Sequence, residues 1–280
     1  MILDAHVHVF PDEFREDRTS LFPGEPAFEL LYSNPSSPIA GRDDLLEDMD
    51  RFGVERAVIF GFPWESEEHC RRHNDYILES VAERPRRLTG LCCASLSCPG
   101  CLRELERCLD AGLCGVGELA VYQSNGSLQS HPVLREVLAL CEEHDAPVLL
   151  HTNEPVGHAY PGKTPMTLAD LYGLLRDHPR NRIILAHWGG GLVFYALLKR
   201  EVGEVLRNVW FDTAASPFLY RPEIYRIAGE IAGFDRILFG SDYPLIKPDR
   251  YLSEIHRAGL PEDAMDMLTG ANAARVYGGS

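Results

Sequence analysis

The chain has 280 residues, of which 45% are hydrophobic, and its formal net charge at pH 7 is −15. This length is typical of one α/β barrel domain, and the apolar content can fill a large core. The acidic excess repels phosphate backbones, which makes nucleic acid an unexpected partner. No apolar run approaches the roughly 20 residues of a membrane span. No leader precedes Asp4 either, so the sequence indicates a cytoplasmic protein without a membrane partner.

Apolar runs that are typical of strands covered on both faces recur along the chain. The first, "MILDAHVHVF" at 1–10, also carries Asp4, His6 and His8. Further strand-like runs lie at 55–63, 87–96, 114–122, 146–152, 182–190, 208–216 and 236–244, and helical patterns lie between them at 43–52, 101–112, 131–144 and 167–179 and close the chain at 261–277. Eight strands alternating with helices predict a single-domain (β/α)₈ barrel over residues 1–280. A doubly wound sheet is the alternative, although it would normally stop at five to seven strands.

The segment 11–41, which follows the first strand, is long and rich in proline and aromatic residues. Loops of this length inside a compact domain are more often lids than simple surface excursions. We therefore expect a lid over residues 11–41, in which Phe14, Phe22, Phe28 and Tyr32 line a pocket for a ring-sized substrate.

Polar residues mark the carboxyl ends of several predicted strands, where a barrel places its active groups. They are His6 and His8 on the first strand, Glu118 on the fourth, His151 on the fifth, His187 on the sixth and Asp242 on the eighth. Because side chains alternate along a strand, His6 and His8 share one face about 7 Å apart and can hold one ion. Asp4 is placed to orient one of these imidazoles. The alternatives are hydrogen-bonded core histidines and, for Glu118, a structural acid paired with an arginine.

The loop after the fifth predicted strand carries His158, Tyr160 and Lys163 within six residues. Lys163 is either a partner for a substrate carboxylate or a solvated surface residue. Trp188, beside His187, is either a core residue or a platform for a substrate ring. The eight cysteines are scattered, which indicates reduced thiols, and "CPGC" at 98–101 is the one pair at redox or metal spacing.

The motifs "DAHVH", "LLHT", "LAHWGGG" and "LFGSDYP", in this order, resemble those of the amidohydrolase superfamily, and in particular its amidohydrolase-related family. The resemblance implies that His6, His8, His151 and Asp242 bind metal and that Asp242 also transfers a proton. It implies that His187 acts on the substrate or the water, or holds a second ion. Strand 4 carries Glu118 and no lysine, which resembles the strand of related binuclear deoxyribonucleases, so one ion or two are expected.

The ligand types favour Zn²⁺, while Mn²⁺ and Fe²⁺ also suit three histidines and an aspartate. Three functions follow from the resemblance and the residues. The leading expectation is a hydrolase that activates water against a small lactone, ester or amide, with Asp242 and His187 as catalytic residues. The alternative is a metal-dependent non-oxidative decarboxylase of a small ring carboxylate. The third is a barrel that binds a small molecule without turnover. The segment 64–75 favours a charged helix face, with contact of Arg71 and Arg72 to a second subunit of a homo-oligomer as the alternative.

Overall fold

The computed structural model describes residues 1–122 and 128–278. Within them, eight parallel strands lie in the order β1-β2-β3-β4-β5-β6-β7-β8. The strands are β1 (Leu3–His8), β2 (Arg56–Phe60), β3 (Leu88–Cys92), β4 (Gly115–Leu119), β5 (Val148–Leu150), β6 (Ile183–Leu185), β7 (Val209–Asp212) and β8 (Ile237–Leu238). Backbone hydrogen bonds from Ala5 to Phe239 and from His8 to Tyr243 join the first strand to the last. The predicted (β/α)₈ barrel is confirmed.

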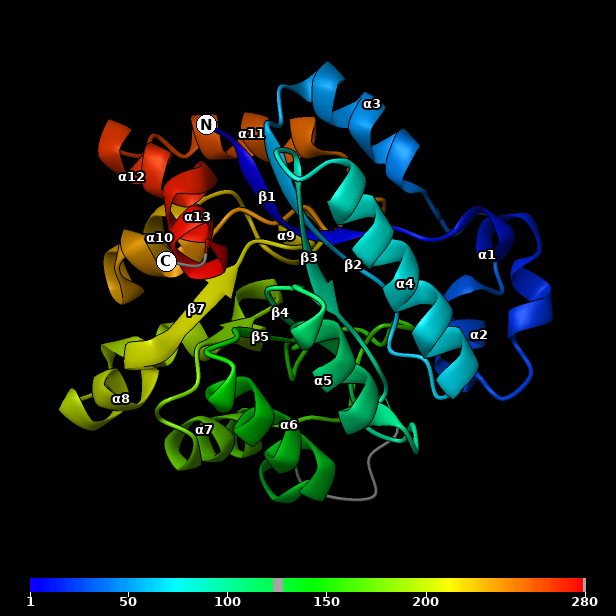
Figure 1. Cartoon of the computed structure of the whole chain (residues 1–280). Helices are drawn as coiled ribbons and strands as arrows, with labels where there is room; N and C mark the ends of the chain where they lie inside the picture. The colour runs from blue at the N-terminus through cyan, green and yellow to red at the C-terminus, as the bar shows by residue number, and fades with distance from the viewer. Residues whose placement is uncertain (123–127, 279–280) are drawn as a thin grey trace.

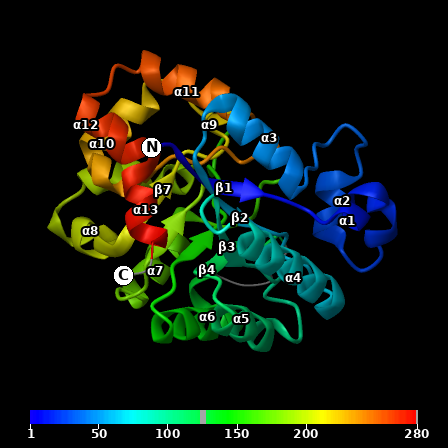
Figure 2. The same cartoon turned by 45° about the horizontal axis from the view of Figure 1, so that its top comes forward.

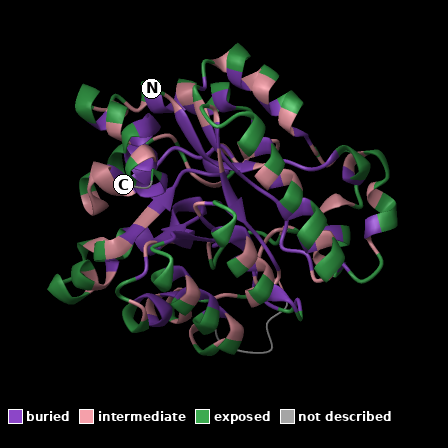
Figure 3. Ribbon diagram, in the orientation of Figure 1, coloured by how far each residue is buried: buried purple, intermediate pink, exposed green. Residues whose placement is uncertain are grey.

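Helices surround the barrel (Figures 1 and 2). They are α3 (Arg42–Phe52), α4 (Glu67–Glu83), α5 (Cys101–Asp110), α6 (Pro132–Glu143), α7 (Leu168–Asp177), α8 (Arg200–Val205), α9 (Ser216–Leu219), α10 (Ile224–Ala232), α11 (Pro248–Arg257), α12 (Glu262–Asp266) and α13 (Asn272–Tyr277). The strands are buried and the helices expose their outer faces, as amphipathic helices on a barrel do (Figure 3). Among the described helices, none has the length and apolar content needed to cross a bilayer.

The segment 11–41 folds into α1 (Asp12–Glu16), a short 3₁₀ turn (Arg18–Leu21) and α2 (Pro26–Tyr32), beside α4 (Figure 1). Phe14 and Phe28 are fully buried, and their rings lie 5.3 Å and 4.5 Å from that of Trp64. The buried carboxylate of Glu25 accepts hydrogen bonds from the backbone of residues 65 and 66, at the start of α4. Phe14 and Phe28 therefore attach this segment to the barrel, and the expectation that they line an open pocket is wrong.

The closing helical pattern at 261–277 is interrupted in the structure. A wider turn at Met267–Ala271 separates α12 from α13. A side chain at Gly270 would place its Cβ 2.4 Å from the carbonyl oxygen of Met1. This glycine lets the chain pass close to the first strand, which a regular amphipathic pattern does not reveal.

Candidate metal centre

The six residues at the predicted strand ends meet at the mouth of the barrel. Their potential ligand atoms form three overlapping groups, in each of which all atoms lie within 4.8 Å of one another. The groups are His6, His8 and Glu118; His6, His187 and Asp242; and Glu118, His151 and His187. β1 and β4 supply His6, His8 and Glu118 directly, while the other three residues follow β5, β6 and β8. Each side chain therefore lies where the sequence places it, and the roles of these residues in binding and catalysis stay a prediction.

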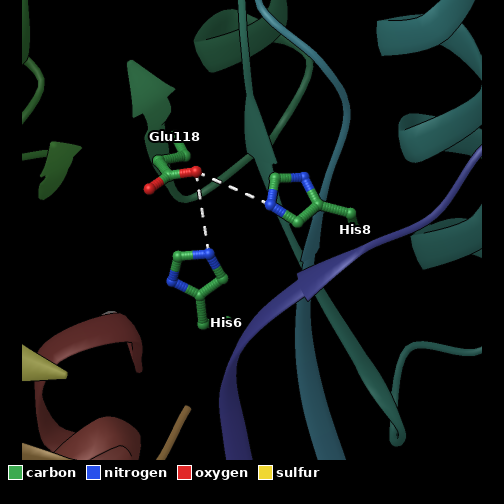
Figure 4. Close-up of side chains that lie close together, drawn as sticks. All are labelled: His6, His8 and Glu118. Carbon is green, nitrogen blue, oxygen red and sulfur yellow. Dashed lines mark ion pairs between the residues drawn. The ribbon is translucent and has the colours of Figure 1, made fainter. Parts of the chain in front are cut away.

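Glu118 occupies the centre of this cluster. Its Oε2 lies 3.7 Å from Nε2 of His6 and 3.6 Å from Nε2 of His8 (Figure 4). Its Oε1 lies 3.0 Å from Nδ1 of His151 and 3.6 Å from Nε2 of His187. The carboxylate thus separates two pairs of imidazoles. Within the described part of the chain its ion-pair partners are histidines, rather than the arginine of the structural alternative.

A buried carboxylate, Asp212 at the end of β7, orients His6. Asp212 Oδ2 lies 2.8 Å from Nδ1 of His6, so that nitrogen donates its hydrogen to Asp212 and Nε2 is the atom that faces the cluster. Nε2 is buried without a hydrogen-bond partner, and Oδ1 of Asp242 lies 3.6 Å away. Buried polar atoms normally have a hydrogen-bond partner. A buried imidazole nitrogen that lacks one and faces two carboxylates is suited to bind a cation between them.

The residue expected to orient an imidazole was Asp4, and that expectation is wrong. Oδ1 of Asp4 accepts the backbone N–H groups of His6, at 3.2 Å, and of Ser241, at 2.9 Å. Asp4 therefore joins the backbone of the first strand to the segment that carries Asp242. Sequence reasoning missed Asp212, although an acid within the apolar predicted strand 208–216 was the available signal.

Backbone carbonyls fix the orientation of two further imidazoles. Nδ1 of His8 lies 3.3 Å from the Gly61 oxygen, and Nδ1 of His187 lies 3.0 Å from the Ala214 oxygen. A carbonyl only accepts, so Nδ1 carries the hydrogen and Nε2 faces the cluster. In His151 the arrangement is reversed, because Nε2 lies 2.9 Å from the Gly162 oxygen and Nδ1 faces Glu118.

The cluster holds opposite charges in a buried space. Burial acts to raise the pKa of Glu118, but His151 and then His6 outweigh it and hold that pKa well below the usual range. Burial acts to lower the pKa of His6, but Asp212 and then Glu118 raise it to about 10. For His187, burial is likewise outweighed by the hydrogen bond with Glu118 and the charge of Asp242, and the pKa rises to about 9. Without a cation, imidazolium groups balance these carboxylates at neutral pH.

Two of the cluster residues sit on strained backbone. His187 has φ 55° and Asp242 has φ 58°, in the left-handed region that residues other than glycine rarely adopt. The turn after His187 continues in this region through Gly190, where a Cβ would lie 2.2 Å from the Asn153 oxygen. The "HWGGG" sequence thus allows a close approach of two loops that directs His187 inward, and such strain is typical of functional sites.

The loop residues predicted to bind substrate mostly contact other residues of the protein. Nζ of Lys163 lies 3.2 Å from Oε1 of Glu154, and Tyr160 donates to Oε2 of the same carboxylate at 3.0 Å. His158 is exposed, with its ring centroid 5.9 Å from that of Tyr160. Trp188 is fully buried and donates to Ser216, so of its two alternatives the structure shows core packing. A substrate role for the other three stays a prediction.

Comparisons with known proteins bear on the family and the activity. A family model described as Amidohydrolase matches residues 3–279. The chain is 27% identical over 209 residues to 6-methylsalicylic acid decarboxylase of Penicillium expansum, an alignment that covers 63% of this chain and 64% of that protein. It is 31% identical over 253 residues to the gamma-resorcylate decarboxylase of Rhodococcus jostii strain RHA1, covering 74% and 76% of the two chains.

A solved structure shares the fold along the whole chain. It is a dihydroxybenzoic acid decarboxylase from Polaromonas sp. JS666 with bound manganese and the inhibitor 2-nitroresorcinol. The TM-score is 0.74 at 20% identity, and the match covers 99% of this chain and 96% of that one. The curated relatives named above are decarboxylases of aromatic acids, which contradicts the leading expectation of a lactone, ester or amide hydrolase. The alternative, a decarboxylase, agrees with them.

Proposed function

The chain belongs to the amidohydrolase family, and from this premise we propose that it is a metal-dependent, non-oxidative decarboxylase of a small aromatic carboxylate. The names of its curated relatives support the reaction class. The single observation that carries the proposal for this chain is the buried Nε2 of His6, which has no hydrogen-bond partner and faces the carboxylates of Glu118 and Asp242. We extend the proposal to a cytoplasmic enzyme, which the free, mostly buried cysteines support.

The donor set fits divalent cations. Nε2 of His6 and of His8, with Oε2 of Glu118 and Oδ1 of Asp242, would hold one cation. Oε1 of Glu118 faces a second pair, His151 and His187, so we include a second cation in the proposal. Imidazole and carboxylate ligands suit Mn²⁺, Fe²⁺ and Zn²⁺ alike. Manganese is the first ion to test, because the Polaromonas decarboxylase binds it.

The reaction replaces a carboxylate on the ring by a proton and releases carbon dioxide. A bound cation supplies positive charge that holds the oxygens of the substrate. Asp242 is the proton carrier in this proposal, because its carboxylate opens to the mouth with an exposed side-chain fraction of 14%. When only the first cation is bound, Nε2 of His187, which lies in the same group of ligand atoms as Asp242, is free to return a proton to Asp242.

Aromatic residues provide a surface for a planar substrate. The ring centroid of Tyr122 lies 5.9 Å from that of His151. Tyr122 also lines a small surface pocket together with residues 95–97 and Ala27 of α2. The segment 11–41 therefore contributes to the walls of the mouth, which supports the lid that we propose for it. Burial followed by the charge of Asp242 raises the pKa of Tyr32, which keeps this phenol protonated beside the carboxylates.

The test is decarboxylation by the purified protein loaded with Mn²⁺ or Zn²⁺. Hydroxylated benzoates are offered, and carbon dioxide release and the arene product are measured. In deuterium oxide, the product is expected to carry one deuterium at the carbon that held the carboxylate. Tight binding of these acids without carbon dioxide release would instead support the non-catalytic barrel. Failure to bind either metal or acid would refute the proposal altogether.

A further inference from the structure

Seven of the eight cysteines are buried, and two of them meet from distant parts of the chain. Sγ of Cys70, in α4, lies 3.9 Å from Sγ of Cys98, in the loop after β3. The two residues are 28 positions apart, and no spacing motif joins them. The sequence instead draws attention to Cys98 and Cys101 of "CPGC", whose main chains form a turn in which Cys101 donates to the Cys98 carbonyl at 3.0 Å.

We propose that Cys70 and Cys98 form a reversible disulfide when the protein meets a hydroperoxide. Each sulfur is in van der Waals contact with the other, and an approach of about 2 Å would give a bond of normal length near 2.05 Å. The geometry selects Cys70 as the partner of Cys98. It does not select the neighbour in sequence, since Cys101 begins α5 and is buried on its inner face. The inference is independent of the proposed decarboxylation.

The two thiols have different roles in this step. Cys70 donates its S–H toward Trp64 O, at 3.1 Å, and toward Cys98. The hydrogen bond from Cys70 lowers the pKa of Cys98, against the effect of burial, whereas that of Cys70 is raised. Cys98 is therefore the nucleophile, because thiolate character determines reactivity toward peroxide.

The chemistry balances with hydrogen peroxide as the oxidant. The Cys98 thiolate attacks one peroxide oxygen, the O–O bond breaks, and a sulfenic acid forms; the leaving hydroxide takes up the proton lost from Cys98 and becomes the first water. The Cys70 sulfur then attacks the Cys98 sulfur, the S–O bond breaks, and the second water leaves with the Cys70 proton. Two thiols and one hydrogen peroxide give one disulfide and two waters. A dithiol reductant reverses the reaction by exchange.

The bond would connect two walls of the barrel mouth. Residues 95–97, directly before Cys98, line the same small pocket, and so does Glu65, five residues before Cys70. The disulfide would tie the start of α4 to the loop after β3 at this pocket. Oxidation is therefore expected to reduce the local opening of these two segments, which is measurable by amide hydrogen exchange over residues 64–70 and 95–101.

The experiment treats the purified, metal-loaded protein with hydrogen peroxide, blocks remaining thiols, and maps non-reduced peptides by mass spectrometry. We expect one crosslink between the peptides of Cys70 and Cys98, a fall in titratable thiols by two from eight, and full reversal by dithiothreitol. Cys98→Ser should abolish the crosslink. Cys101→Ser is the matched control from the same turn and should retain it.

A second variant separates the steps. Cys70→Ser removes the resolving thiol, so the sulfenic acid at Cys98 should persist and be trapped by dimedone. A crosslink between Cys98 and Cys101 would overturn the proposal, as would the absence of any crosslink while Cys98 is over-oxidised. The map of the unsubstituted protein decides the question by itself if a serine variant does not fold.

Discussion

Asp212 holds His6 in one tautomer. The 2.8 Å contact between Oδ2 and Nδ1 leaves Nε2 of His6 facing the candidate metal centre. Removing such an orienting carboxylate typically lowers metal affinity about 10–100-fold. We expect this loss in Asp212→Asn, measured by calorimetric titration of the metal-free protein with Mn²⁺. Asp4→Asn is the matched control, because Asp4 is similarly buried but its hydrogen bonds go to Ser241 and to the backbone N–H of His6 rather than to an imidazole. Equal Mn²⁺ affinity in both variants would show that Asp212 does not contribute to metal binding.

Asp242 is expected to act on the proton in addition to any role as a ligand. Asp242→Asn keeps an oxygen for the cation and removes the proton carrier. General acid–base groups typically contribute about 10²–10⁴-fold. We therefore expect decarboxylation to fall by about that factor while the variant still binds metal, as determined by elemental analysis after dialysis. A variant that turns over as fast as the parent would leave Asp242 only a ligand or a structural acid.

Glu118 is expected to connect two cations through its two oxygens. Glu118→Gln preserves the shape of the side chain and removes the negative charge that faces four imidazoles. The expected result is a fall in bound metal from two ions per chain toward one, with at least about a 100-fold loss of turnover. Metal content measured at matched protein concentration is the direct readout. If stoichiometry and turnover both survive, Glu118 has a structural role.

Metal binding is expected to displace protons. In the metal-free protein, Asp212 and Glu118 outweigh burial to raise the pKa of His6 to about 10, and that of His187 rises to about 9. At pH 7 a cation must therefore displace these protons, so its apparent affinity should rise by up to about tenfold per pH unit for each proton. Calorimetry in buffers of different ionisation enthalpy counts the protons released. Affinity that is constant between pH 6 and 8 would contradict the charge balance described for the cluster.

The same pKa shifts make the metal-free protein less stable as the pH rises, whereas metal affinity increases with pH. A raised histidine pKa stabilises the fold fully below the unfolded value of about 6.5. The contribution is lost as the pH rises through 9 and then 10, the values of His187 and His6. Chelated protein should thus lose resistance to urea between pH 6.5 and 10, and Mn²⁺ should restore it most strongly at the upper end.

His73 should make the fold sensitive to acid. It is fully buried, its Nε2 lies 2.6 Å from the Val9 carbonyl oxygen, and its Nδ1 accepts the indole N–H of Trp64 at 2.9 Å. Burial lowers its pKa to about 3. In the unfolded chain, His73 binds a proton below about pH 6.5, whereas in the folded protein it stays neutral down to about pH 3. The folded state therefore loses stability as the pH falls from about 6.5 to 3.

The magnitude follows from the pKa difference between the two states. Each pH unit between about 6.5 and 3 should remove about 1.4 kcal/mol of unfolding free energy through this residue. His73→Gln can keep a donor and an acceptor but does not titrate, so the difference in urea stability between pH 7 and pH 4.5 should shrink by about 2–3 kcal/mol. His256→Gln, which replaces an exposed histidine in the last turn of α11, is the control. An unchanged pH dependence in His73→Gln would contradict this account.

The barrel was predictable because its strands are apolar on both faces and its helices are amphipathic. The ends of the strands and helices were harder to predict from the sequence. The predicted strand 236–244 is a regular strand only over Ile237–Leu238, and the chain then departs from strand geometry to place Asp242 at positive φ before Tyr243 pairs again with Val7. Local propensity contains no signal for that departure.

Within the site, residue types at strand ends were enough to collect the six residues of the cluster. Orientation was not predictable, because it depends on partners that meet only in the fold. Asp212 rather than Asp4 orients the imidazole of His6. The ammonium group of Lys163 is already hydrogen-bonded to the carboxylate of Glu154. The contact between Cys70 and Cys98 likewise arises from the packing of α4 beside the loop after β3.

The cluster spans the seam of the barrel, since β1 carries two of its histidines while Asp242 follows β8, 234 positions after His8. During synthesis on the ribosome, the histidines emerge first and remain without their last carboxylate until nearly the whole chain has left the exit tunnel. A nascent chain therefore cannot assemble the complete cluster early, even in a cell rich in transition metals. On the proposal that the cluster binds metal, capture of the ion would be one of the final events of biogenesis, and truncation before residue 242 should abolish it regardless of how much of the barrel has formed.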